Sequence, residues 1–154
     1  MNLEYSGEEK IPAGHATVWA FVTDPDKVGR CLPEVVDVSV QDATHCEASV
    51  LVAVGPVRGT LKVNVELIPD AAGKRVDLKI SGSGFSSTVD VTAAADLLDP
   101  ADGTTTLKWS GQAVARGMVA AVGGRLLEAQ ARKLIEQTFA NVRQQLTAST
   151  PPSR

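Results

Sequence analysis

The chain has little cysteine, the residue that cross-links small extracellular domains and binds structural metal ions. Among 154 residues there are only two cysteines, Cys31 and Cys46, and their separation fits neither a zinc motif nor a disulfide framework. A chain of this length buries an ordinary hydrophobic core without covalent help. We therefore expect one domain in which both thiols are reduced and buried, as in a cytoplasmic protein.

Excess positive charge and long apolar runs are absent as well. The formal net charge is -3 at pH 7, which leaves no basic surface for nucleic acid. Charged residues appear by Glu8, so the start of the chain does not resemble a signal peptide. The most apolar run, 113–127, contains Arg116 and Arg125 and therefore predicts no membrane-spanning helix.

What the chain does contain is a series of segments that alternate between apolar and polar residues. In 61–67 the odd positions are leucine or valine, whereas the even positions are Lys62, Asn64 and Glu66. This period of two is typical of half-buried strands. Short turns separate the segments, so neighbouring strands must be antiparallel. We predict strands at 2–11, 35–41, 44–54, 57–69, 74–82, 86–98 and 104–116.

Helical patterns follow the first strand and the last. Residues 16–22 predict one short helix, and Asp24 with Pro25 predicts the capped start of a second over 26–31. After Gly123-Gly124, apolar residues recur at spacings of three and four as far as Leu146, which predicts a long helix. We thus expect one α+β domain over 1–146, in which a curved seven-stranded antiparallel sheet surrounds that helix, and a disordered tail over 147–154.

The apolar strand faces leave space and carry little chemistry. A face that mixes valine with alanine and glycine either packs closely against a helix or encloses a void, and both possibilities remain open. His15 and His45 are isolated, and no Ser-His-Asp or metal-ligand set can be assembled from them. The small residues on the apolar side are Ala48, Ala93, Ala95, Gly111, Ala113 and Ala115.

Four segments of the chain resemble the CoxG family of carbon monoxide dehydrogenase subunits, a branch of the helix-grip superfamily of START-like and birch-allergen-like lipid-binding domains. They are VWAFVTDP at 18–25, CLP at 31–33, VGPVRG at 54–59 and VGGRLL at 122–127. Family members usually have glycine where this chain has Glu34. Many relatives also continue past the long helix into an apolar or amphipathic tail that meets the membrane, so 147–154 is a possible truncated anchoring extension.

The resemblance implies a non-catalytic protein that links a molybdenum hydroxylase of the carbon monoxide dehydrogenase type to the inner face of the cytoplasmic membrane. Such an enzyme passes electrons to quinones that are confined to lipid. The resemblance therefore implies an apolar cavity that carries menaquinone, ubiquinone or a lipid, with no covalent cofactor. The alternative is a recruitment or assembly factor that docks the hydroxylase without carrying a ligand. A cyclase or hydrolase is a third possibility, but it needs an acid or base on the inner strand faces, which supply none.

Candidate ligand contacts come from the inner strand faces, the first helix and the long helix. Trp19 and Phe21 either stack on a ligand ring or pack their helix on the sheet, and Phe85 and Met118 are candidates for a flexible gate. We expect Val65→Trp or Ala113→Phe to fill the void and abolish binding. The full set is Trp19, Phe21, Leu32, Val52, Val63, Val65, Leu78, Ile80, Phe85, Val89, Val91, Leu107, Trp109, Ala113, Met118, Leu127 and Leu134.

Overall fold

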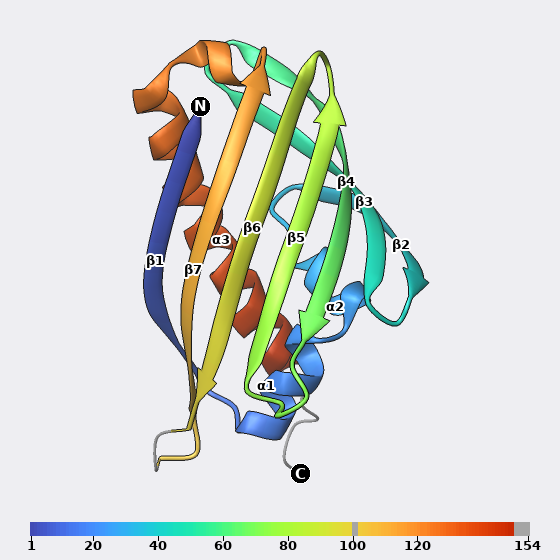
Figure 1. Cartoon of the computed structure of the whole chain (residues 1–154), viewed down its shortest axis with the longest axis vertical. Helices are drawn as coiled ribbons and strands as arrows, with labels where there is room; N and C mark the ends of the chain where they lie inside the picture. Colours follow the sequence, from blue (N-terminus) through green and yellow to red (C-terminus); the bar gives the residue numbers. More distant parts are fainter. Residues whose placement is uncertain (100–101, 150–154) are drawn as a thin grey trace.

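The computed structural model describes residues 1–99 and 102–149, with side chains up to Leu146 in the last helix. Seven strands and three α-helices follow one another in the predicted order (Figure 1). The elements are β1 (Asn2–Ile11), α1 (His15–Val22), α2 (Pro25–Arg30), β2 (Val35–Asp42), β3 (His45–Val54), β4 (Val57–Pro69), β5 (Arg75–Gly84), β6 (Ser87–Leu98), β7 (Thr105–Gly117), the 3-10 turn η1 (Ala120–Val122) and α3 (Gly124–Ser149).

All seven strands form one antiparallel sheet in the order β1-β7-β6-β5-β4-β3-β2. The sheet curves, and α3 runs diagonally across its concave side (Figure 1). The short helices α1 and α2 lie near one end of the sheet, and η1 leads into α3 at the other. The predicted α+β architecture is confirmed.

Local sequence explains the two turns that shape the ends of this layer. Asp24 accepts hydrogen bonds from the backbone N–H groups of Asp26 and Lys27, at 2.9 and 3.4 Å, and so caps α2 as predicted. Glu34 has φ 56°, a left-handed conformation that glycine adopts with less strain than glutamate. Its carbonyl oxygen accepts a hydrogen bond from the N–H of Leu51, so the strained turn is fixed to β3.

The last helix differs from the prediction at its end. We expected a disordered tail from residue 147, but α3 continues to Ser149. The rest of that predicted tail, 150–154, and part of the predicted turn at 99–103 lie outside the described residues.

The hydrophobic core consists of three separate clusters. One lies where α1 meets β1, β6, β7 and the end of α3, around Ile11, Val18 and Leu107. A second lies on β3, β4 and β5, and contains Cys46 and Val65. The third, at the opposite end from the first, consists of Val54, Ala115, Val119 and Leu127. The clusters therefore fill the two ends and one side of the space on the concave face of the sheet.

Candidate functional site

A cavity of about 960 Å³ lies between the concave face of the sheet and α3. Inner-face residues in the middle of the sheet, among them Val91, Ala93 and Ala113, are only half-buried although they point away from bulk solvent. Inner-face residues at the ends, such as Leu107 and Ala115, are 3% exposed. The interior is therefore hollow at its centre and closely packed at its ends.

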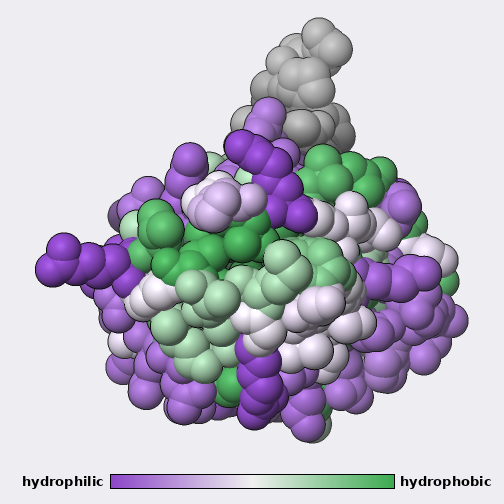
Figure 2. All heavy atoms as spheres, turned by 90° about the horizontal axis from the view of Figure 1, so that it is seen from above, coloured by the Kyte–Doolittle hydropathy of each residue, from purple (hydrophilic) through white to green (hydrophobic). Residues whose placement is uncertain are grey.

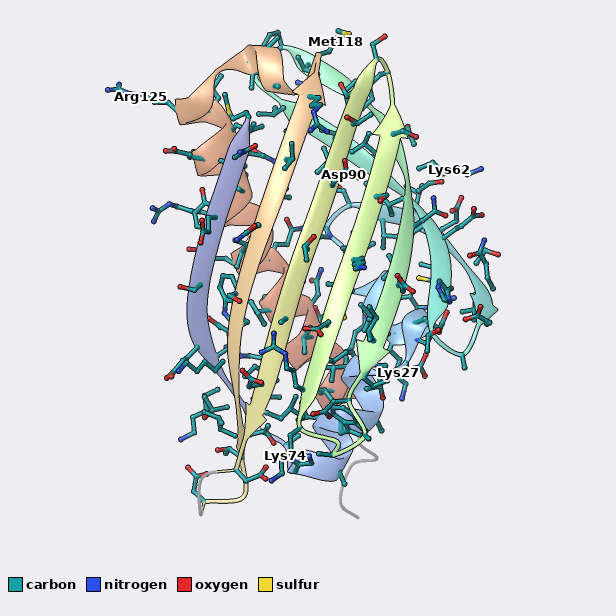
Figure 3. The ribbon with its side chains drawn as sticks, viewed as in Figure 1. Lys27, Lys62, Lys74, Asp90, Met118 and Arg125 are labelled. Atoms are coloured by element: carbon teal, nitrogen blue, oxygen red, sulfur yellow. The ribbon has the colours of Figure 1, made fainter. Side chains whose placement is uncertain are left out.

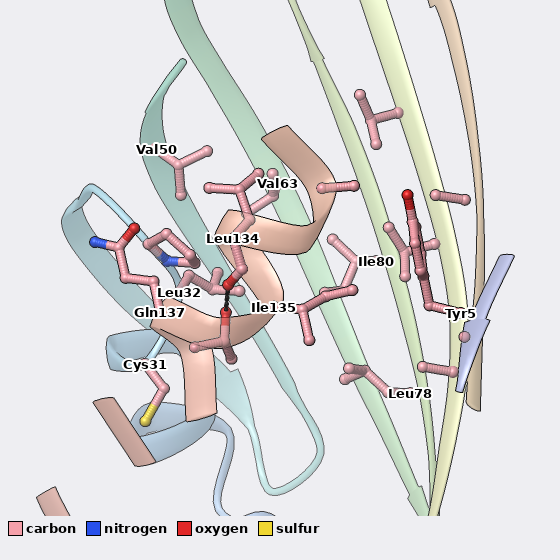
Figure 4. A pocket seen from close by; sticks show the side chains of 18 of the residues that line it. Tyr5, Cys31, Leu32, Val50, Val63, Leu78, Ile80, Leu134, Ile135 and Gln137 are labelled. Carbon is pink, nitrogen blue, oxygen red and sulfur yellow. Dashed lines mark hydrogen bonds between the residues drawn. The ribbon is translucent and has the colours of Figure 1, made fainter. Parts of the chain in front are cut away.

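The walls of this cavity are mainly aliphatic. Figure 4 shows Leu78, Ile80 and Val63 projecting from the sheet towards Leu134 and Ile135 of α3. On α3, the Thr138 hydroxyl donates a hydrogen bond to the Leu134 carbonyl at 2.7 Å, so its proton is not available to a ligand. A wall of this composition can take up apolar chains, because they are then removed from water.

Small residues keep the centre of the sheet open. A Cβ placed on Gly111 would lie 3.4 Å from the Cβ of Ala93, an ordinary contact, so this glycine leaves usable space. In the sheet register Gly111 pairs with Ala93, and Ala113 with Val91. These small side chains face α3, and larger side chains at the same positions would have filled the space between the sheet and the helix.

Polar contacts fix α3 along its β1 side. The Tyr5 hydroxyl donates to the Glu128 carbonyl at 3.2 Å, and the Arg132 guanidinium lies 5.6 Å from the centre of the Tyr5 ring. Arg143 pairs with the Glu9 carboxylate and donates to the Lys10 carbonyl at 3.2 Å. These contacts hold the helix at one edge of the sheet.

On the side of α2, polar contacts attach the last turns of α3. The Asn141 side-chain amide donates to the Cys31 carbonyl at 3.1 Å, and that of Gln145 donates to the Arg30 carbonyl at 3.0 Å. Burial raises the pKa of the Cys31 thiol to about 12, so this cavity-lining group stays protonated and is a poor nucleophile at neutral pH.

Thirteen of the seventeen candidate contacts line the cavity, and their role in ligand binding stays a prediction. They come from strands β3 to β7, from α1 and α3, and from the loop after α2, which the fold brings together around one space. They are Phe21, Leu32, Val52, Val63, Leu78, Ile80, Val89, Val91, Leu107, Trp109, Ala113, Leu127 and Leu134.

The other four candidates lie elsewhere. Val65 is 1% exposed inside the β3–β4–β5 cluster, and Trp19 packs its helix at the closed end, with its ring 6.4 Å from that of His15. Phe85 covers Gly59, where a Cβ would lie 2.3 Å from the Phe85 ring, so it is held in place rather than loose. Met118 is 50% exposed on the outer surface.

Several lining residues were missing from the sequence prediction. They lie on β1, on the flank of α3 and in the loop before β2, and several of them are polar. The helical spacing that placed Leu127 and Leu134 also places Ile135 and Phe139 on this side of the helix, whereas the polarity of Gln130 and Gln137 concealed their position. The missed residues include Leu3, Tyr5, Gln130, Ile135, Gln137 and Phe139, together with Glu34 and Lys133.

Trp109 is an unusual member of the wall. Its indole Nε1–H is buried without a hydrogen-bond partner within the described residues. A Cβ added to Gly7 would lie 3.3 Å from this nitrogen, so the N–H faces the backbone of β1. The other face of the indole is available to the cavity, where it packs at 5.5 Å from the Phe139 ring. Trp109 is thus a fluorescent reporter of the interior when Trp19, the other tryptophan, is replaced by phenylalanine.

The histidines do not form a catalytic arrangement. The Nδ1 atom of His45 contacts both the Asp42 carboxylate, at 2.7 Å, and the Thr44 hydroxyl, at 3.0 Å, whereas a catalytic triad uses opposite ring nitrogens. His15 contacts Asp99 at 2.8 Å and the Gly73 carbonyl at 2.7 Å. Neither histidine lines the cavity.

Metal-binding clusters and membrane-spanning helices are both absent from residues 1–99 and 102–149. No group of three or more histidine, cysteine or acidic residues in this part of the chain could hold a metal ion. Nor does any helix there combine the length and apolarity needed to cross a membrane.

Comparisons with known proteins agree with this geometry. A family model for CoxG, a subunit of carbon monoxide dehydrogenase, matches residues 7–147. No curated protein matches significantly. A conserved protein from Geobacillus kaustophilus is 22% identical, with a TM-score of 0.85 and coverage of 96% of this chain and 97% of that one.

Two more solved structures share the fold at lower identity. A START superfamily protein from Mycobacterium smegmatis is 13% identical, with a TM-score of 0.69 and coverage of 96% of this chain and 99% of that one. Ara h 8.0201 is 14% identical, with a TM-score of 0.65 and coverage of 97% and 100%. The fold is START-like.

Proposed function

The chain belongs to the CoxG family of carbon monoxide dehydrogenase subunits, and we propose that it is a non-catalytic carrier of an isoprenoid quinone or lipid. In this role the cavity takes menaquinone, ubiquinone or a lipid and connects a molybdenum carbon monoxide dehydrogenase-type enzyme to the membrane respiratory chain. The observation that carries the proposal is the hollow apolar centre between packed ends.

The size and polarity of the cavity support a long apolar ligand. Its volume, about 960 Å³, is at the upper end of ordinary ligand sites. Burial of an isoprene unit, which has five carbons, is worth about 4 kcal/mol relative to water. A bilayer offers the same tail a similar environment, so transfer between membrane and cavity is nearly balanced and reversible. Reversible exchange suits a shuttle.

One end of the molecule carries features that suit a membrane surface. Met118, Leu126 and Met1 are 50%, 46% and 41% exposed, and Leu126 lies against Gly55. Seen from above, Figure 2 shows apolar side chains gathered on this end with polar ones around them. Met118 and Arg125 both lie at this end (Figure 3).

The charges near that end fit an anionic bilayer. Arg125 precedes Leu126 in α3, although the chain as a whole has net charge -3. Arg116 lies two residues before Met118, and its guanidinium is 3.7 Å from the Asp90 carboxylate. Cationic side chains beside exposed apolar groups bind membranes that contain anionic lipids. This arrangement supports a location at the membrane surface. It equally supports the alternative, a recruitment factor that docks the hydroxylase without a ligand.

Extraction of bound molecules tests the carrier role. The protein is purified from a quinone-producing host, and organic extracts are examined by mass spectrometry beside extracts of the Ala113→Phe variant. We expect near-stoichiometric quinone or lipid from the natural sequence and little from the variant. Empty extracts from both, together with capture of the hydroxylase by both, would instead favour the recruitment role.

A further inference from the structure

The cavity reaches the surface along one flank of α3. Its wall includes the exposed side chains of Glu34, in the loop before β2, and of Lys133, on α3. Neither residue belongs to the sheet, so both line the cavity at its rim. We call this rim the portal and define it by Leu32, Glu34 and Val50 on one side and by Gln130, Lys133 and Gln137 on the other.

The portal lies between two points where α3 is attached. Leu127 packs with Val54 above it, and Asn141 donates to the Cys31 carbonyl below it. From Gln130 to Gln137 the helix rises about 10 Å, enough for the width of a ring system. In Figure 4 the Gln137 side chain points from α3 towards the loop that contains Leu32.

The polar side chains of the portal have no partners within the described part of the protein. Gln130, Lys133 and Gln137 make no hydrogen bond or ion pair there, although Gln130 and Gln137 are half-buried. Elsewhere the wall is dominated by aliphatic groups. A half-buried amide keeps its hydrogen-bonding capacity for water or for a ligand. The portal is therefore a place where hydrogen-bond donors border the apolar interior; Arg58 and Thr60 of β4 are exposed lining residues outside it.

We propose that the portal holds the polar head of the ligand, with Gln130, Gln137 and Lys133 donating hydrogen bonds to its oxygen atoms. The apolar tail then extends inwards over Ala113 and Ala93. This inference rests on the proposed carrier function and adds the orientation of the ligand and the chemistry of its head. The head must bear oxygen acceptors, as the carbonyl oxygens of a quinone or the phosphate and ester oxygens of a phospholipid do.

The test distinguishes recognition of the ligand's head group from burial of its tail. Binding of menaquinone with two isoprene units is followed by quenching of Trp109 fluorescence. An isoprenoid hydrocarbon without a head group and dihexanoyl phosphatidylglycerol, which do not quench, are measured by their displacement of this menaquinone. The variant is Gln130→Leu/Gln137→Leu. Its matched control is Gln144→Leu, since Gln144 lies on the same helix, is exposed and is not part of the cavity wall.

We expect the double variant to bind the quinone about tenfold more weakly, because two hydrogen bonds are lost, and to bind the hydrocarbon as before. Selective loss of the phosphatidylglycerol probe instead would support the portal and identify a phospholipid head. Equal affinity of the double variant and the control for both headed probes would overturn the head-group site while leaving the carrier role intact. Failure of the unmodified protein to bind any probe would overturn both.

Discussion

Filling the cavity from the centre of the sheet is the most direct test of its purpose. Ala113 lies on β7 between Leu3 of β1 and Val91 of β6, and its half-buried side chain lines the cavity. Ala113→Phe adds a ring of six carbons to open space, about the size of one isoprene unit. Exclusion of that unit removes roughly 4 kcal/mol of tail burial, which weakens binding by about a thousandfold.

The assay is an equilibrium titration with a two-isoprene menaquinone, followed by quenching of Trp109. Thr92→Phe is the control, because Thr92 is an exposed position on the outer face of neighbouring β6. Both variants should unfold at about the temperature of the natural protein when no ligand is present, since neither ring meets a packed core. Equal quinone affinity of the two variants would refute the assignment of the cavity as the binding site.

Three further predictions concern stability, each measured by urea unfolding. Val65→Trp should destabilise the fold by about 1–3 kcal/mol, because Val65 lies in a packed cluster rather than in the cavity; a stable variant without ligand binding would contradict this. Glu34→Gly should stabilise it by about 0.5 kcal/mol by relieving the left-handed strain, whereas Glu34→Ala should not. The Gly73 carbonyl, and then Asp99, raise the pKa of His15, so its stabilisation is complete below about pH 6.5 and is lost as pH rises through the higher folded-state pKa. His15→Gln should flatten the dependence of stability on pH in that window, and an unchanged slope would argue against this role.

The strands, and which of their side chains face inwards, were predictable because the alternation of apolar and polar residues is a property of the local sequence. Alternation in β4 placed Val63 and Val65 on the inner face, and both are there. Alternation does not say which inner residues border a void. Val65 pairs with Cys46, against which α2 packs at Gly29, so this part of the inner face is covered. Val63 lies two residues before Val65 in β4, beyond the part of the strand that α2 covers, and it borders the cavity.

The polar rim was harder to predict than the walls. Lys133 is an exposed residue of the long helix, as its charge suggests, but it also reaches the cavity. Gln130 and Gln137 were not predicted, because amide side chains on a helix flank usually face water. Their significance depends on how far α3 is held from the loop at Glu34, and that distance is set by tertiary contacts such as Tyr5 with Glu128.

The volume of the interior shows that it is not a defect in an ordinary core. Buried voids left by truncated side chains destabilise proteins by about 24 cal/mol per Å³, so a sealed dry void of about 960 Å³ would cost roughly 23 kcal/mol. That exceeds the roughly 5–15 kcal/mol that typically separates folded from unfolded chains. The fold avoids this cost because its stability comes from the continuous sheet and the packed clusters at its ends and side, while the portal lets water or a ligand occupy the centre. A ligand that replaces this water should raise the melting temperature with its concentration, as expected when only the folded state binds.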